Sequence, residues 1–228
     1  DLVLATLTLT APALAQGKSK KASIAVAPFT YHNNVRRKPG TELETGAFTK
    51  KFITSLGKSN KFDVVERDSL DTLFTEMKLS DAGFTDPSRA VKAGEMFGVD
   101  YFLMGEISVW TVSSRSNKIP RMQRYRRTVD MHLIVDMRIV NARTSKIVAT
   151  EKGEITRTWQ SGLMKHLPPA MTRLEPVTAD GVERELCAQL VKKVIDTIYP
   201  LKILKVNSSG MVFVNRGEGG GINEGDVY

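Results

Sequence analysis

The side chains with the greatest capacity for chemistry are few and widely separated in this sequence. Three histidines, His32, His132 and His166, fall in an expected loop, an expected strand and a proline-flanked segment, and their spacing matches no metal-binding pattern. Cys187, the only cysteine, falls in the apolar stripe of an expected helix. A free thiol in such a stripe behaves as a small hydrophobic side chain. We therefore expect structural or surface roles for all four residues.

Two further patterns have the composition of phosphate-binding or catalytic sites. Residues 217–221, GEGGG, are rich in glycine, but no Lys-Ser/Thr pair and no helical pattern follows them, so we expect a turn. Asp81 and Asp86 form an acidic pair, but Asp86 is placed to cap a helix, and nothing in the sequence brings the two around a cleft. The sequence thus predicts a protein that is not an enzyme and that holds no metal or cofactor.

The clearest charge feature is the segment RSNKIPRMQRYRR, residues 115–127, which holds six basic residues between two expected strands. A solvated hairpin tip would explain it. The alternative is a binding surface for an acidic partner, with Met122 and Tyr125 as anchors. The residues of that surface would be Arg115, Lys118, Arg121, Arg124, Tyr125, Arg126 and Arg127.

Apolar periodicity predicts the strands that would position these segments. Residues 23–29 and 62–65 favour short buried strands, and residues 99–112 and 127–140 favour two long ones. Residues 147–159 can return as an antiparallel partner, so the sheet should be mixed. In the second long strand every second residue is apolar, which predicts one buried face. That face would consist of Val129, Met131, Leu133, Val135, Met137 and Ile139.

Helices are expected to flank this sheet. The first should end at Gly57, and others should cover residues 70–77, 87–97 and 178–199, the last of them stopped by Pro200. The inward face of the first helix would hold Phe48, Phe52, Ile53 and Leu56. The predicted fold class is therefore α+β (mixed α/β), a mixed sheet flanked by helices.

Composition and the first residues predict an exported globular protein. The chain has 228 residues, 41% of them hydrophobic, with a net charge of +8, which favours acidic partners. Residues 1–16 form an apolar run that ends in Ala-Leu-Ala, the pattern of a signal peptide, and are too short to span a membrane. Residues 17–22 would be a linker, 23–200 the main domain, and 201–228 the start of a small β-module that is cut off at Tyr228. Export argues against nucleic acid as a partner.

A resemblance to a known family sharpens these expectations. The segment FDVVERDSLDTLFTEMKLSDAGFTDPSRAVKAGEMFGVDYFLMGEI, with IAVAPF and GAFTKKFITSLGKSNK before it, resembles the family of the curli secretion channel protein CsgG, over about residues 22–199. The same fold is similar to a lipoprotein activator of penicillin-binding proteins, the N-terminal domain of TolB and a domain of the flagellar H-ring protein T, whose C-terminal β-module resembles residues 206–228. The resemblance implies a periplasmic domain that forms ring-like homo-oligomers in channel members.

The resemblance also implies roles for particular residues. The family's constriction loop falls between the first strand and the first helix, although an ordinary exposed loop would explain that segment equally well. Its counterparts here would be Tyr31, Asn33, Asn34, Arg36, Arg37 and Lys38. Glu66 and Arg67 could form ion pairs between subunits or a local ion pair.

The hairpin segments separate the possible functions. Channel members insert two hairpins per subunit into the outer membrane. A strand that spans the membrane needs apolar side chains, but residues 115–127 are cationic. It also needs amide donors, which Pro168 and Pro169 in residues 157–177 lack. We therefore expect a periplasmic accessory, either free or associated with the outer membrane, that oligomerises or docks on envelope proteins to support assembly or secretion of a curli-like or flagellar structure. A secretion channel for curli-type subunits and an activator of penicillin-binding proteins are alternatives. A hydrolase would need a pocket joining Asp130, His132 and Asp136.

Overall fold

The fold centres on one mixed β-sheet. The computed structural model describes residues 21–36, 40–65, 98–168, 176–208 and 210–215. The strands of the main sheet are β1 (Ala22–Val26), β2 (Thr30–Tyr31), β3 (Phe62–Val64), β4 (Tyr101–Ile119), β5 (Arg124–Asn141) and β6 (Ile147–Gln160). Their order is β3-β1-β4-β5-β6, with β2 also paired to β4. Strand β1 pairs in parallel with β3 and with β4, and β2 pairs in parallel with β4, whereas β5 is antiparallel to both β4 and β6. The predicted α+β class and mixed sheet are confirmed.

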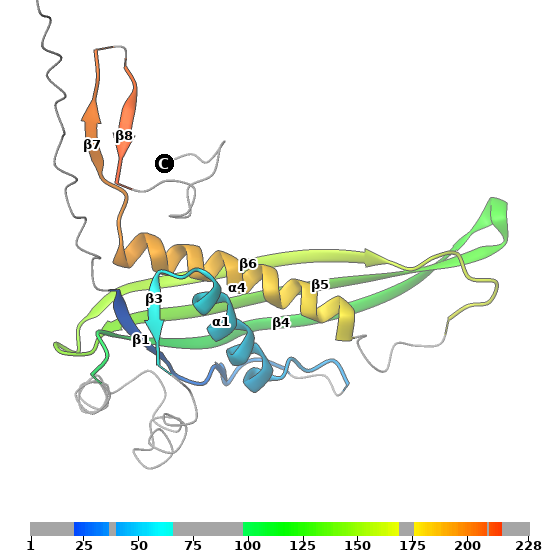
Figure 1. The fold of residues 1–228 in the computed structure, drawn as a ribbon. Helices are drawn as coiled ribbons and strands as arrows, with labels where there is room; N and C mark the ends of the chain where they lie inside the picture. The colour runs from blue at the N-terminus through cyan, green and yellow to red at the C-terminus, as the bar shows by residue number, and fades with distance from the viewer. Residues whose placement is uncertain (1–20, 37–39, 66–97, 169–175, 209, 216–228) are drawn as a thin grey trace, which may run out of the picture.

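Two helices, α1 (Thr45–Lys58) and α4 (Pro176–Ile198), lie against one face of this sheet (Figure 1). Strand β5 turns every second side chain toward them, as the alternation predicted. These side chains are all at most 3% exposed: Val129, Met131, Leu133, Val135, Met137 and Ile139. They form a single apolar core with the inward faces of the two helices.

Helix α1 follows the predicted pattern but ends differently. Phe48, Phe52 and Leu56 are fully buried, as expected. The prediction that Gly57 ends the helix is wrong, because α1 continues to Lys58. The left-handed residue that turns the chain is Asn60, with φ of 53°, and its N–H donates to the carbonyl of Gly57 at 3.1 Å. Asparagine adopts this conformation more readily than most residues, so it replaces glycine at the turn.

Helix α4 packs closely on β6 because of one glycine. A Cβ at Gly153 would lie 2.9 Å from Cδ1 of Leu186 and Cδ2 of Leu190, so the missing side chain makes room for the helix. The apolar stripe predicted for this helix is buried, and the helix ends at Ile198, two residues before Pro200, as predicted.

The β4–β5 hairpin is longer than the sequence pattern predicted. Its ladder continues without interruption from Arg115 paired with Thr128 to Ile119 paired with Arg124, and a 3-10 turn, η2 (Pro120–Met122), closes it. The apolar alternation that marked the strands stops earlier because no core covers this part. Backbone pairing needs no core, and only Pro120, in the turn, lacks an amide donor. We call residues 115–128 the outer hairpin, and residues 101–114 paired with 129–141 the inner hairpin.

The predicted β-module begins as a separate hairpin. Strands β7 (Ile203–Val206) and β8 (Val212–Val214) form a two-stranded sheet that extends away from the end of α4 (Figure 1). The helices predicted at residues 70–77 and 87–97, and the turn predicted at 217–221, lie outside the described residues. Gly98, expected at the end of the second of these helices, has the left-handed backbone that suits such an end, with φ of 61°.

Candidate docking surface

The outer hairpin is the most strongly charged part of the described structure. Its six basic residues lie in a stretch, from residue 107 to residue 129, that contains no aspartate or glutamate. Arg115 forms an ion pair with Asp130, just inside the inner hairpin. Lys118, Arg121 and Arg124 form no ion pair with any residue that the structure describes. The predicted acidic-partner residues are thus brought onto one ribbon, with few local counter-charges.

The cations lie on both faces of that ribbon. Residues directly opposite each other in an antiparallel pair share a face, and successive residues alternate. Lys118 pairs with Tyr125, and both lie on the face that is buried against the helices in the inner hairpin. Arg124 and Arg126 oppose Ile119 and Asn117 on the other face. The positive charge therefore surrounds the ribbon.

Residues that follow β6 hold the base of the outer hairpin. The amide of Ser161 donates to the carbonyl of Arg127 at 2.9 Å, and the Arg127 amide donates to the Ser161 hydroxyl at 3.0 Å. Tyr125 and Met164 exchange two backbone hydrogen bonds, at 2.8 and 2.9 Å. No apolar alternation marks these residues, so the sequence did not predict this pairing. In the outer hairpin, β5 is therefore hydrogen-bonded on both sides, to β4 and to the segment after β6.

The end of the ribbon exposes apolar side chains among the cations. Met122 is 59% exposed, Pro120 near it is exposed, and Ile119 is half-buried. The sequence predicted Met122 as an anchor but did not indicate Ile119 and Pro120 as part of the tip. Pro120 could have indicated the turn at the tip, because proline is favoured at the start of a turn.

The predicted constriction loop is only partly a loop. Tyr31 belongs to β2, and its hydroxyl accepts from the Leu43 amide at 2.9 Å and donates to the Leu43 carbonyl at 2.7 Å. This side chain therefore fastens the segment to the core. Asn33, Asn34 and Arg36 are exposed, as a loop requires. Arg37 and Lys38, like the predicted interface residues Glu66 and Arg67, lie outside the described residues.

The structure does not join Asp130, His132 and Asp136 in a pocket. They follow one another on the face of β5 opposite the helices, each with a separate partner. His132 Nε2 lies 2.9 Å from Oε1 of Glu154, and Ser108 donates to Asp136. The Thr158 hydroxyl donates to Asp130 at 2.7 Å and, with nearby Arg115, lowers the pKa of that carboxyl. These groups stabilise the sheet surface, and their arrangement offers no shared site for a substrate.

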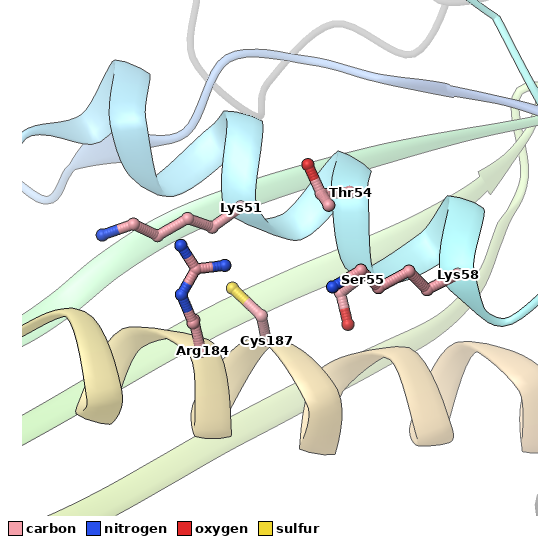
Figure 2. Close-up of a pocket in the computed structure, with 6 residues that line it drawn as sticks. All are labelled: Lys51, Thr54, Ser55, Lys58, Arg184 and Cys187. Atoms are coloured by element: carbon pink, nitrogen blue, oxygen red, sulfur yellow. The ribbon is translucent and has the colours of Figure 1, made fainter.

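A small pocket of about 160 Å³ lies between α1 and α4 (Figure 2). Lys51 reaches across it to Glu183 at 2.5 Å and to Asp180 at 3.0 Å, so its charge is already matched. Burial raises the pKa of Glu183, and Lys51 only partly offsets this effect. Burial also raises the pKa of Cys187 to about 12. A thiol that stays protonated is a poor nucleophile, so the pocket offers little chemistry.

The described residues also lack two further kinds of feature. Among them, no three His, Cys, Asp or Glu side chains gather so that they could hold a metal ion. No helix in the same part of the chain is both long enough and apolar enough to cross a membrane.

The comparison with known families decides where this fold belongs. A family model described as "Curli production assembly/transport component CsgG" matches residues 6–162, more than half of the chain. The chain belongs to the CsgG family. The predicted resemblance is confirmed, and membership places the chain among envelope proteins with accessory or secretion-related functions.

No curated protein matches this CsgG family member. Among solved structures, the hypothetical protein CT253 from Chlamydia trachomatis is similar at 11% identity and a TM-score of 0.47, over 77% of this chain and 98% of that one. Lipoprotein GNA1162 from Neisseria meningitidis is similar at 15% identity and a TM-score of 0.42, over 78% and 97%. The LpoB C-terminal domain from Salmonella enterica is similar at 17% identity and a TM-score of 0.40, over 62% and 87%.

Proposed function

We propose that this chain is an exported, non-enzymatic accessory protein of the cell envelope. It oligomerises, or docks on a larger envelope assembly, to support the assembly or secretion of a surface structure such as curli or a flagellum. Membership of the CsgG family supports this class of function. The main structural support for the proposal is the outer hairpin, a ribbon with six cations that extends beyond the two helices (Figure 1). Such a projection suits contact with an acidic partner.

The remaining segments have defined roles in this proposal. Residues 1–16 direct export and residues 17–22 are a linker to the domain of residues 23–200. Residues 201–228 belong to a β-module that takes part in docking. Its first hairpin exposes more apolar surface than a stable free-standing hairpin should, which supports a covered location. The exposed apolar residues are Ile203, Leu204, Val206, Met211, Val212 and Phe213.

Size-exclusion chromatography with light scattering tests the oligomer. The protein is measured with and without detergent. We expect a species larger than one chain that forms without detergent. A monomer under both conditions would remove oligomerisation and leave docking as the whole of the proposal.

Removing positive charge from the outer hairpin tests whether it docks on an acidic partner. Neutralising Arg124, Arg126 and Arg127 to glutamine should weaken retention on an acidic matrix and on isolated envelope fractions, strongly at low salt and less at high salt, because salt screens exposed charges. A matched variant, Lys50→Gln, Lys58→Gln and Lys202→Gln, removes the same charge from exposed positions elsewhere. Equal losses for the two variants would mean that the outer hairpin has no special role.

A second candidate function is an outer-membrane secretion channel for curli-type subunits. The observation in its favour is the unbroken ladder of the outer hairpin, which extends to the turn. A channel should be extracted only with detergent and should conduct ions in planar bilayers. A conducting, detergent-dependent oligomer would replace the first proposal, whereas a protein that is stable without detergent and does not conduct would support it.

A further inference from the structure

The tip of the outer hairpin combines two properties that are unfavourable together in water. Met122 and Pro120 are exposed at the very end of the ribbon, with Ile119 beside them. Lys118, Arg121 and Arg124 lie within four residues of Met122, without an ion pair in the described part of the chain. Exposed apolar surface and closely spaced like charges each raise the free energy of the isolated tip. A partner that is both apolar and anionic would relieve both costs.

The distribution of charge over the ribbon discriminates between kinds of partner. Lys118 lies on one face and Arg124 on the other, and neither forms an ion pair within the described residues. A protein that docks on one face would leave the cations of the other face unmatched. A layer of lipid headgroups surrounds an inserted ribbon on all sides and can supply phosphates to both faces. The long stems of lysine and arginine let their charges reach that layer while the tip goes deeper.

The length of the outer hairpin fits an end-on approach. Four residue pairs, from Ser116 with Arg127 to Ile119 with Arg124, extend past the last pair of β5 with β6, which is Thr128 with Gln160. At a rise of about 3.4 Å per residue they place the tip roughly 14 Å beyond the end of β6. The folded core can therefore stay in water while the tip reaches the boundary between headgroups and acyl chains. Tyr125, close to the tip, is a residue type that is favoured at this boundary.

We infer that the tip of the outer hairpin inserts end-on into an anionic phospholipid surface. Ile119, Pro120 and Met122 enter the boundary between headgroups and acyl chains, and the surrounding lysine and arginine side chains bind lipid phosphates. This inference rests on the proposed docking function and names the partner of the same site. The tip anchors the protein at the surface and does not cross the bilayer.

Vesicle flotation of the full chain tests the inference. The vesicles contain phosphatidylcholine alone or phosphatidylcholine with phosphatidylglycerol. We expect binding to the anionic vesicles only, reduced by salt. Lys118→Gln, Arg121→Gln and Arg124→Gln together should lower the partition coefficient on the order of a hundredfold. Met122→Gln should lower it about tenfold, because less apolar surface is buried. The matched variant of Lys50, Lys58 and Lys202 should change it less than about threefold.

Fluorescence reports whether the tip enters the lipid. Met122→Trp adds a tryptophan at the tip to the two of the wild type, Trp110 and Trp159. Its emission should move to shorter wavelength with anionic vesicles, and brominated acyl chains should quench it. Wild-type protein gives the background, and circular dichroism shows that each variant is folded.

Three outcomes would overturn the inference. Equal flotation with neutral and anionic vesicles would mean that lipid charge is not recognised. Binding that needs the cations but not Met122, without a spectral shift, would indicate docking on a generic acidic surface such as a protein, and the proposed docking function would survive. Absence of vesicle binding would remove the lipid partner, while light scattering and envelope retention would still decide the proposed function separately.

Discussion

The inner and outer parts of the β4–β5 hairpin have the same backbone and opposite surroundings. Both belong to one antiparallel ladder. In the inner hairpin, Leu133 and Ile107 are fully buried beneath the helices, and buried Trp110 donates its indole N–H to the carbonyl of Thr41 at 2.6 Å. In the outer hairpin the corresponding face carries Lys118 and Arg127. Backbone hydrogen bonds are enough to extend the two strands, whereas the side chains determine whether a part of a strand stabilises the fold or is available to bind a partner.

The largest difference in stability is expected between two variants that each truncate an apolar side chain. Leu133→Ala, in the inner hairpin, should lower the free energy of unfolding by about 3 kcal/mol, because it leaves a cavity in a closely packed core. Met122→Ala, at the 59% exposed tip, should change it by less than about 0.5 kcal/mol. Urea denaturation followed by circular dichroism measures both. Similar losses for the two variants would show that the tip is covered within the same chain.

Two glycines give the next contrast. A Cβ at Gly105 would lie 1.8 Å from Cε1 of Phe29, whose ring packs against Phe48 and Phe52. Gly105→Ala should therefore cost about 2 kcal/mol of stability through overpacking. Gly162, beside the base of the outer hairpin, has open space around its Cα, so Gly162→Ala should be close to neutral. Thermal unfolding of the two variants tests the pair, and a neutral Gly105→Ala would mean that the Phe29 ring has room to move.

A smaller effect is expected when charge is removed from the outer hairpin. Lys118→Gln, Arg121→Gln and Arg124→Gln together should change the free energy of unfolding by less than about 1 kcal/mol, because two of these cations are exposed, the third is half-buried, and none forms an ion pair within the described residues. The same variant should leave a cation exchanger at clearly lower salt than the matched variant of Lys50, Lys58 and Lys202. A large loss of stability would mean that these cations hold the hairpin together.

The smallest effect concerns Asp130, where the two parts of the hairpin meet. The Thr158 hydroxyl and then Arg115 lower the pKa of this carboxyl. A lowered folded pKa stabilises the protein above the unfolded pKa, and that contribution is lost as pH falls through the folded value. Thr158→Val and Arg115→Gln should each move the Asp130 pKa up toward its usual value. Carboxyl NMR titration measures both shifts. An unchanged pKa in Thr158→Val would rule out this hydrogen bond as the cause.

Much of the fold could be predicted because burial leaves a periodic mark on the sequence. The alternation from Val129 to Ile139 and the stripe over residues 178–199 identified the core face of β5 and of α4 correctly. The ends of elements were less predictable: Gly57 did not end α1, because the turn was made at Asn60. The spacing of the cations predicted one basic segment, and its role in binding an acidic partner stays a prediction; Ile119 and Pro120 were not recognised as part of the tip.

Residue types and their local spacing were enough to predict the mixed sheet, its buried face and the concentration of positive charge in residues 115–127. Three further features became visible in the folded chain alone: this charge lies on both faces of a paired ribbon, Tyr125 and Arg127 are held by the segment after β6, and Asp130, His132 and Asp136 have separate partners. Backbone hydrogen bonds cause this difference. They join residues far apart in the chain without requiring any particular side chain, so no local pattern records them.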